Sequence, residues 1–467
     1  MNRFFLILIY ILSINCSEEK ESYDLIIQNG NIIAIETGTI SKENIYITDG
    51  IIKKTTPADV KIQAIAHTVV DATDKYIIPG LWDNHVHFRG GDTLIKANKN
   101  FLNLFIANGI TTVRDAGGDL TTAVQKWNTA IKNGELIGPT IFTSGPKIDG
   151  PNGTWAGSLE VENEADIKKV LDSLQTLQTD FVKLYDSRIS GENYLKTIRE
   201  TEKRGLITSG HMPFTVTLDE TVTAGIDAIE HLYYIMKGCA SNEQEITQQL
   251  NRKEIGFWQA MPALMQNYQD STAQKTFASL KENNVYVVPT LHIGKILSYL
   301  DEVDHTNDPY LKYMGSGIIK TYEGRIKGAL NASKQARKNR KELDVFFGKL
   351  THSLHNAGVG LLAGSDSGAF NSYTYPGISL HKELEEMVAN GLSPLNALQT
   401  TSYNGAKFLK KENYGTISEE KIADLLLLDK NPLEDIKNTK AIFMVIKNGT
   451  IYTQKELKGF LKAAIQH

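Results

Sequence analysis

The stretch Pro79-Gly80-Leu81-Trp82-Asp83-Asn84-His85-Val86-His87 carries two histidines one residue apart, shortly after the apolar run Tyr76-Ile77-Ile78. In a β-strand, side chains alternate between the two faces, so His85 and His87 would project to the same side. Neutral imidazole nitrogens presented together can bind one divalent cation. Two such histidines can equally be incidental polar residues of a loop. Partners elsewhere in the chain must therefore decide between the two interpretations.

The composition is that of an ordinary globular protein without a charged binding surface. Of the 467 residues, 41% are apolar, and 50 Lys and Arg residues nearly balance 54 Asp and Glu residues, which gives a formal net charge of −4. This length allows one large barrel with an appendage, or about two to three smaller domains. The even charge balance leaves no basic surface for nucleic acid, so we expect a small-molecule substrate.

The N-terminal residues have the pattern of an export signal. Arg3 precedes an apolar run, Phe4–Leu12, which is too short to cross a bilayer but has the length of a secretory signal core. We predict a signal peptide over residues 1–15 and a polar tether over residues 16–22. The placement of Cys16 resembles that in bacterial lipoproteins, which predicts lipid anchoring in the cell envelope, in the periplasm or at the outer-membrane surface. Plain secretion with an incidental cysteine is the alternative.

Only one other cysteine, Cys239, is present. A structural disulfide is therefore not expected, and Cys239 is predicted to be a small buried apolar residue. Contact with a membrane is expected only through the lipid anchor.

Both ends of the mature chain have the pattern of short strands joined by tight turns. Residues 23–75 contain the pairs Asn29-Gly30 and Asp49-Gly50, and residues 412–455 contain Asn448-Gly449, which are typical of hairpin turns. Each segment is too small to enclose a core alone. We therefore predict one small β-sandwich domain built from both termini.

Residues 76–411 alternate strand and helix patterns, with amphipathic stretches such as Ala165–Leu177 and Glu192–Arg204 between the apolar ones. A repeated β/α rhythm of this kind predicts an α/β fold, a closed (β/α)8 TIM barrel. The expected barrel strands are Tyr76–Leu81, Thr111–Arg114, Thr140–Ser144, Phe181–Tyr185, Leu206–Ser209, Ala228–His231, Val285–Pro289 and Gly360–Ala363. The intervals 238–284 and 301–350 exceed ordinary connections, so we expect helical insertions that form a lid or rim, or that serve as contacts of a homo-oligomer.

Functional side chains of such a barrel gather at the C-terminal ends of its strands, and several metal-binding residue types fall there. Lys183 lies within an apolar strand, where an unpaired ammonium is costly, unless it reaches the barrel rim. His211 and His231 end consecutive strands, which favours a metal over two separate structural histidines. Asp366 follows the last strand, where a turn-forming role is the alternative.

These residues occur in the order of the metal ligands of the amidohydrolase superfamily, which the chain resembles over nearly its whole length: His85, His87, Lys183, His211, His231 and Asp366. The strand-four lysine is similar to that of the binuclear subgroup that includes prolidase-like dipeptidases. A more distant similarity is to imidazolonepropionase, which lacks this lysine. The motif Gly210-His211-Met212-Pro213 replaces the His-Ala-His common among close relatives.

The resemblance implies a centre of two divalent cations, with zinc expected. It implies that His85, His87 and Asp366 hold one cation, that His211 and His231 hold the other, and that Lys183, carbamylated by CO₂, bridges them. It further implies that a metal-bridging hydroxide attacks the substrate carbonyl while Asp366 takes the proton and passes it to the leaving nitrogen, as the catalytic acid–base.

We therefore expect a hydrolase that cuts a C–N bond, in a dipeptide or an N-acyl amino acid. The alternatives are a mononuclear imidazolonepropionase-like or deaminase-like hydrolase, an ester or lactone hydrolase, and a non-catalytic surface lipoprotein, against which the intact ligand set speaks. Candidate substrate-binding residues near the site are Tyr233, Tyr234, His292, Arg114 and Tyr185, each of which could instead only pack the barrel rim.

Overall fold

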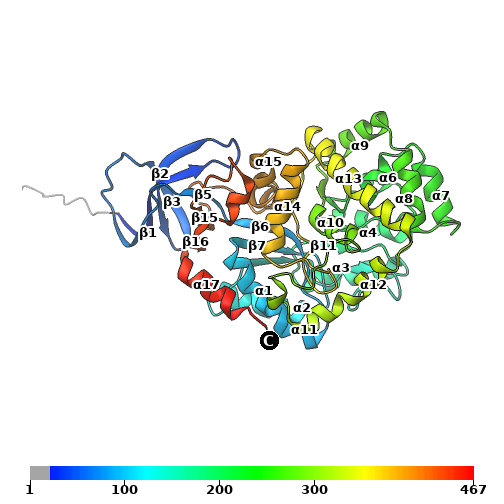
Figure 1. The fold of residues 1–467 in the computed structure, drawn as a ribbon, viewed down its shortest axis with the longest axis horizontal. Helices are drawn as coiled ribbons and strands as arrows, with labels where there is room; N and C mark the ends of the chain where they lie inside the picture. Colours follow the sequence, from blue (N-terminus) through cyan, green and yellow to red (C-terminus); the bar gives the residue numbers. More distant parts are fainter. Residues whose placement is uncertain (1–20, 467) are drawn as a thin grey trace, which may run out of the picture.

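A computed structural model describes residues 21–466 of the chain (Figure 1). It is a parallel α/β barrel joined to a β-domain made by both ends of the chain, which confirms the fold class predicted from the sequence. The predicted signal peptide and Cys16 lie outside the described residues. Within residues 21–466, no helix is both long and apolar enough to span a membrane.

Strands from both ends of the chain form one eight-stranded sheet, in the order β17-β16-β15-β5-β1-β2-β3 with β4 paired to β1. Strand alternation divides the side chains of β15 between two environments. Leu425 and Leu427 enter the sheet's own apolar core, whereas Leu426 and Leu428 pack into the core of the barrel. The strands are β1 (Ser22–Ile33), β2 (Ile40–Thr48), β3 (Ile51–Pro57), β4 (Ile65–Asp71), β5 (Tyr76–Pro79), β15 (Leu425–Leu428), β16 (Ile442–Lys447) and β17 (Thr450–Thr453).

The predicted first barrel strand, Tyr76–Leu81, is wrong in its boundaries. Residues Tyr76–Pro79 are β5 of the terminal sheet, antiparallel to β15, and the first barrel strand is β6 (Leu81–Val86). Gly80 joins the strand of the terminal sheet to the first barrel strand. A residue with a Cβ does not fit at this position, because the Cβ would collide with the side chain of Thr111. The apolar run before the two histidines thus belongs to the β-domain.

The barrel strands run parallel and close into a ring in two ladders. β6 pairs with β7 and β7 with β8, and β9, β11, β12, β13 and β14 form the other ladder. The two ladders meet where the Asp180 N–H donates to Thr143 O over 2.9 Å. These strands are β6, β7 (Ile110–Asp115), β8 (Thr140–Thr143), β9 (Ile148–Asp149), β10 (Leu159–Glu160), which pairs with β9, β11 (Val182–Leu184), β12 (Thr208–Gly210), β13 (Ala228–Glu230) and β14 (Tyr286–Val288).

The eighth strand predicted at Gly360–Ala363 is an extended segment with isolated bridges in place of a continuous ladder. Leu361 bridges Val287 of β14, and Ser367 bridges Val86 of β6, both in the parallel sense. The segment therefore closes the ring but leaves its backbone free to bend at Asp366, where φ is 53°.

Helices cover the barrel and extend over one end of it (Figure 1). The helices between the first barrel strands are α1 (Ile95–Ala107), α2 (Thr121–Lys132), α3 (Glu164–Thr176), α4 (Gly191–Lys203) and α5 (Leu218–Thr223). The intervals 238–284 and 301–350 are largely helical, and the elements from β13 onward are α6 (Tyr233–Gly238), α7 (Glu243–Asn251), α8 (Phe257–Gln266), α9 (Asp270–Glu282), α10 (Leu291–Ser298), α11 (Gly315–Thr321), α12 (Glu323–Leu330) and α13 (Lys334–Asn356). The last helices are α14 (Ile378–Ala389), α15 (Pro394–Gln399), α16 (Ser402–Phe408) and α17 (Gln454–Ala463), the last of which packs beside α1.

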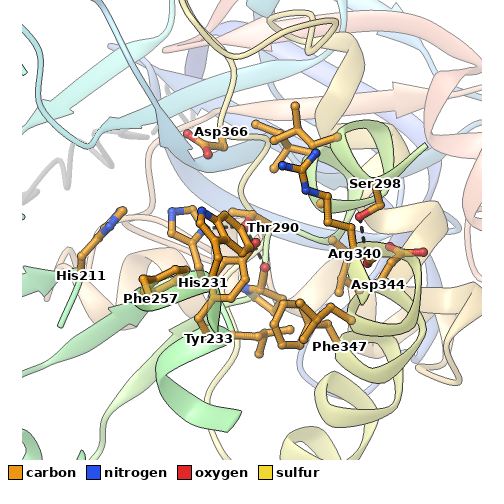
Figure 2. Close-up of a pocket in the computed structure, with 18 of the residues that line it drawn as sticks. His211, His231, Tyr233, Phe257, Thr290, Ser298, Arg340, Asp344, Phe347 and Asp366 are labelled. Atoms are coloured by element: carbon orange, nitrogen blue, oxygen red, sulfur yellow. Dashed lines mark hydrogen bonds between the residues drawn. The ribbon is translucent and has the colours of Figure 1, made fainter. Parts of the chain in front are cut away.

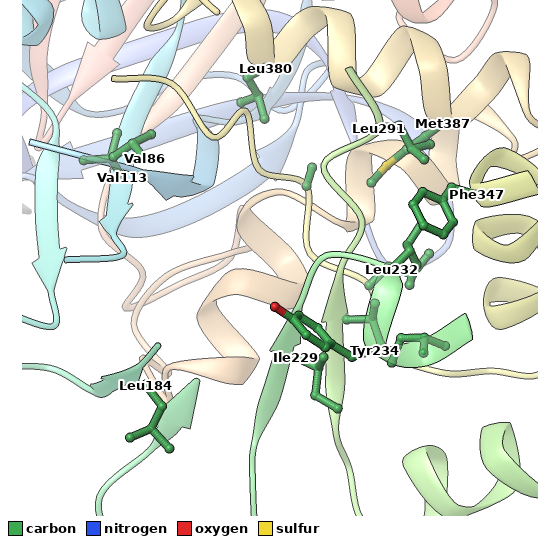
Figure 3. Close-up of a cluster of buried hydrophobic side chains, with 14 of the residues drawn as sticks. Val86, Val113, Leu184, Ile229, Leu232, Tyr234, Leu291, Phe347, Leu380 and Met387 are labelled. Carbon is green, nitrogen blue, oxygen red and sulfur yellow. The ribbon is translucent and has the colours of Figure 1, made fainter. Parts of the chain in front are cut away.

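The apolar core lies between the strands and the helices that cover them. Figure 3 shows Ile229 of β13 and Leu184 of β11 with side chains of neighbouring helices, including Leu380 and Met387 of α14. Local signals set where the helices begin: Asn163 and Asp166 form a capping box at α3. These elements place the C-terminal ends of β6, β11, β12, β13 and β14 around one opening, where the predicted ligands lie.

Candidate active site

Three predicted ligand atoms meet at the end of β6. His85 Nε2 lies 3.2 Å from His87 Nε2, and Asp366 Oδ1 lies 3.4 Å and 3.0 Å from these two nitrogens. In a tetrahedral zinc site with bonds of about 2.0–2.1 Å, neighbouring ligand atoms are about 3.3 Å apart. The separations observed here match the edges of such a tetrahedron, so this donor set fits a divalent metal.

The rings of the histidines are held by partners on their second nitrogens. His87 Nδ1 lies 2.9 Å from Gly117 O, and His231 Nδ1 lies 2.7 Å from the Thr290 hydroxyl. Contacts of this kind fix the tautomer and the orientation of a metal-binding imidazole. His231 and Thr290 both have positive φ, 71° and 51°, a strained conformation that a structure keeps at functional positions.

His231 lies close to His85 and Asp366, and the ring of His211 lies next to that of His231. Ligand atoms of His85, His231 and Asp366 lie within 4.8 Å of one another, a set that can hold a metal ion. The rings of His211 and His231 are 4.8 Å apart between centroids. His211 Nδ1 faces the Asp186 carboxylate at 3.3 Å, and the Tyr234 hydroxyl donates to the same carboxylate over 2.8 Å. Asp186, which sequence reasoning missed, therefore orients His211.

Burial sets the protonation of the cluster. Burial lowers the pKa values of His85, His87 and His211 well below the usual histidine value. These imidazoles are therefore neutral at physiological pH and can donate a lone pair to a metal. Burial alone would raise the pKa of Asp366, but His85 and His87 hold it well below the usual range for a carboxyl group.

Lys183 is completely buried, and its amine contacts the carboxylate of Glu230. Burial, followed by the charges of Lys147 and Arg114, lowers the pKa of Lys183 well below the usual lysine value. Glu230 also accepts from the Ser209 hydroxyl at 2.7 Å and lies 3.5 Å from His85 Nδ1. This carboxylate thus links the lysine to the histidine of the first group.

Sequence reasoning missed Glu230 because strand alternation places it on the face opposite to His231. The strand ends at Glu230, and the positive φ of His231 turns the next side chain back toward the same opening. The available signal was a carboxylate directly before a histidine in the apolar strand Ala228-Ile229-Glu230.

Arg114, predicted as a substrate-binding residue, is not among the residues that line the cavity described below. It is completely buried, and its guanidinium lies 3.0 Å from Glu230 and donates to the Ser209 hydroxyl over 2.9 Å and to Asn84 O over 2.5 Å. A long side chain on an inward-facing strand position reaches the buried carboxylate before it reaches the opening. Arg114 therefore acts on the site through Glu230.

A cavity of about 600 Å³ is lined by three of the candidate metal ligands, His211, His231 and Asp366 (Figure 2). His211, His231 and Asp366 lie along one side of it, and Arg340, Asp344 and Phe347 lie along the other. The volume is in the range typical of small-molecule sites.

The predicted substrate-binding residues divide between this cavity and its surroundings. Tyr233, Tyr234 and Tyr185 line the cavity. His292 does not, although its neighbours Leu291 and Ile293 do, because its helix α10 turns that side chain away. Burial lowers the pKa of His292 to about 3.

The chain belongs to the amidohydrolase family, whose profile matches residues 76–452. It is 22% identical over 437 residues to the ochratoxinase of Aspergillus niger, covering 80% of this chain and 75% of that protein. It is 34% identical over 115 residues to the dihydroorotase of Carboxydothermus hydrogenoformans, a match that spans 26% of that protein and 23% of this chain. Among solved structures, a putative prolidase from Bifidobacterium longum superposes with a TM-score of 0.68 at 20% identity, covering 95% of this chain and 99% of that chain. The resemblance predicted from the six ligand residues is thereby confirmed at the level of the family.

Proposed function

We propose that this hydrolase of the amidohydrolase family cleaves the C–N bond of a dipeptide or an N-acyl amino acid with the help of bound divalent metal. The observation that carries the proposal is the meeting of His85, His87 and Asp366 at the spacing of a tetrahedral metal site, with Asp366 lining the cavity. The likeness to a prolidase fold is consistent with an amide substrate of this size.

The proposed ligand groups are those expected from the sequence. His85, His87 and Asp366 would hold one zinc ion, and His211 and His231 a second. Lys183 would bridge the two as a carbamate, for which a buried amine with a lowered pKa is chemically suited because CO₂ reacts with the neutral form. When bound, the metal supplies polarisation of a carbonyl group and activation of water near neutral pH.

Asp366 is the proposed acid–base residue. Its Oδ1 faces His85 and His87 and accepts from Asn371 Nδ2 over 2.7 Å. Within residues 21–466, Asp366 Oδ2 has no hydrogen-bond partner, and Asp366 lines the cavity. Oδ2 is therefore the atom that would take the proton from the attacking water and return it to the leaving nitrogen.

A mononuclear hydrolase is the second candidate, because Lys183 contacts Glu230 in the structure. An unmodified ammonium paired with this carboxylate would bridge no metals. An ester or lactone substrate would be attacked by the same chemistry.

We further propose that the protein is exported and anchored in the bacterial cell envelope by lipid on Cys16, since a charged start, a short apolar run and this cysteine follow one another. We also propose that the helical insertions over residues 238–284 and 301–350 can form the contacts between subunits of a homo-oligomer.

A substrate screen tests the function. Purified protein is stripped with a chelator, reloaded with zinc and offered dipeptides, N-acyl amino acids, and matched esters. We expect zinc-dependent hydrolysis of amides. Zinc-dependent cleavage of esters alone, or cleavage that survives complete removal of metal, would overturn the proposal.

A further inference from the structure

The inserted helices contribute arginines to the lining of the cavity. Arg325 of α12 and Arg340 of α13 both line the cavity. Within residues 21–466, the guanidinium of Arg325 makes no hydrogen bond and no ion pair. The guanidinium of Arg340 also makes no hydrogen bond or ion pair in this part of the chain, but it lies over the ring of Trp258, 5.8 Å from its centroid. A cation that faces a cavity without a partner is a candidate for binding an anionic group of a ligand.

Arg325 shares its cavity with the residues of the proposed metal centre. His211, His231 and Asp366 line the same cavity of about 600 Å³. A ligand held in this cavity can therefore contact both Arg325 and the proposed metal centre.

Carboxylates that line the cavity do not neutralise Arg325. Asp366 faces His85 and His87, and Asp186 faces His211 and Tyr234. Asp344 lies on α13 and makes no ion pair within the described chain. Among the described residues, the cavity therefore offers a guanidinium that no carboxylate pairs with.

The cavity also has an aromatic wall. The ring of Tyr233 lies 5.4 Å from Phe257, 5.8 Å from Trp258 and 5.0 Å from Phe347, between centroids. Tyr233 follows the metal-side residue His231 directly, whereas Trp258 is 56% exposed at the edge of the cavity. A surface of this kind accepts a large apolar or aromatic side chain.

We propose that Arg325 binds the free carboxylate of the substrate and that the wall formed by Tyr233, Phe257, Trp258 and Phe347 holds the bulky apolar side chain next to that carboxylate. This inference rests on the proposed amide hydrolysis and narrows its substrate to N-acyl or peptidyl amino acids that end in a large apolar residue. The carboxylate would accept two parallel, charge-assisted hydrogen bonds from the guanidinium of Arg325, a bidentate ion pair, at one end of the cavity. The amide to be cleaved would then lie toward Asp366.

The test uses a pair of substrates that differ only in charge. N-acetyl-phenylalanine and its C-terminal carboxamide are offered to the zinc-loaded full chain, and acetate release is measured. We expect the wild type to favour the free acid, and Arg325→Met to lose roughly 10- to 100-fold in kcat/KM for the acid with little change for the carboxamide. N-acetylglycine should be a poorer substrate than N-acetyl-phenylalanine for the wild type.

Two variants separate the role of Arg325 from a general effect of charge or folding. Lys327→Met removes one positive charge from the same helix, where Lys327 pairs with Glu323 at 3.1 Å and is 71% exposed. This control should keep the wild-type preference for the acid. Arg325→Lys should keep part of the preference for the acid, because lysine retains the positive charge but lacks the planar guanidinium that binds a carboxylate through two hydrogen bonds. An Arg325→Met enzyme with the wild-type preference would overturn the inference.

Binding distinguishes failure of this inference from failure of the proposed function. Calorimetry with phenylalanine and phenylalaninamide on the zinc-loaded proteins requires no turnover. If the wild type hydrolyses neither substrate but binds phenylalanine more tightly than its amide, and only Arg325→Met loses this difference, the carboxylate site stands and the amidase proposal is wrong. If the wild type does not bind phenylalanine, or binds it no better than the amide, the carboxylate site is wrong.

Discussion

Replacing Asp366 with Asn separates metal binding from proton transfer. An asparagine can keep its side-chain oxygen at the Oδ1 position, 3.4 Å and 3.0 Å from the nitrogens of His85 and His87, where Asn371 also donates. The amide nitrogen then occupies the Oδ2 position and cannot accept a proton there. We expect metal content to be largely kept while kcat falls about 100- to 10,000-fold, the usual range for a lost acid–base group. This loss corresponds to about 2.7–5.4 kcal/mol of activation free energy.

The assay compares metal content by mass spectrometry with kcat on one amide substrate. His85→Ala should lose metal and activity together, because it removes a ligand and leaves Asp366 intact. Asp270→Asn, at an exposed carboxylate in the first turn of α9, controls for the loss of a charge. Near-wild-type turnover of Asp366→Asn with unchanged metal would refute the assignment of Asp366 as the proton carrier.

The remaining predictions concern the bridge, the stability and the anchor. Lys183→Ala should abolish activity, with partial recovery when a short carboxylic acid is added to replace the carbamate; wild-type turnover of the variant would mean that Lys183 binds no metal. Burial lowers the pKa of His381 to about 4, so folding is favoured by the neutral form, and this contribution is complete above pH ~6.5 and is lost as the pH falls toward 4. At pH 5 the loss is about 2 kcal/mol, and denaturant unfolding of His381→Gln should show a correspondingly weaker decline between pH 7 and pH 5 than the wild type; an identical decline would contradict the buried neutral state. Cys16→Ser should move the protein from the membrane fraction to the soluble fraction, and an unchanged distribution on immunoblots would count against lipid anchoring.

Much of the fold could be predicted from local sequence because apolar runs and strand alternation survive in the structure. The expected strand Thr111–Arg114 corresponds to β7 (Ile110–Asp115), and the expected helix Glu192–Arg204 corresponds to α4 (Gly191–Lys203). The run at Tyr76 predicts a barrel strand, because an apolar strand has the same pattern in either sheet. Only tertiary pairing with β15 shows that it belongs to the terminal sheet.

The site could be predicted as a set of residue types but not as a network. His85 and His87 converge because alternation on β6 puts them on one side, as the spacing predicts. Glu230 could not be found by alternation, because the positive φ of His231 breaks the alternation at the end of the strand. The ring of His231 there contacts Thr290, which lies far along the chain. Arg325 lies in a charged helix whose position over the cavity depends on how α12 and α13 pack, and no local pattern encodes this.

Titrating zinc back into metal-free protein tests the central claim most directly. If His85, His87, His211, His231 and Asp366 form the proposed binuclear centre, amide hydrolysis is absent without metal and reaches its plateau at about two equivalents of zinc per chain. A plateau at one equivalent would contradict the binuclear centre, and full activity in the chelated protein would contradict metal-dependent hydrolysis altogether.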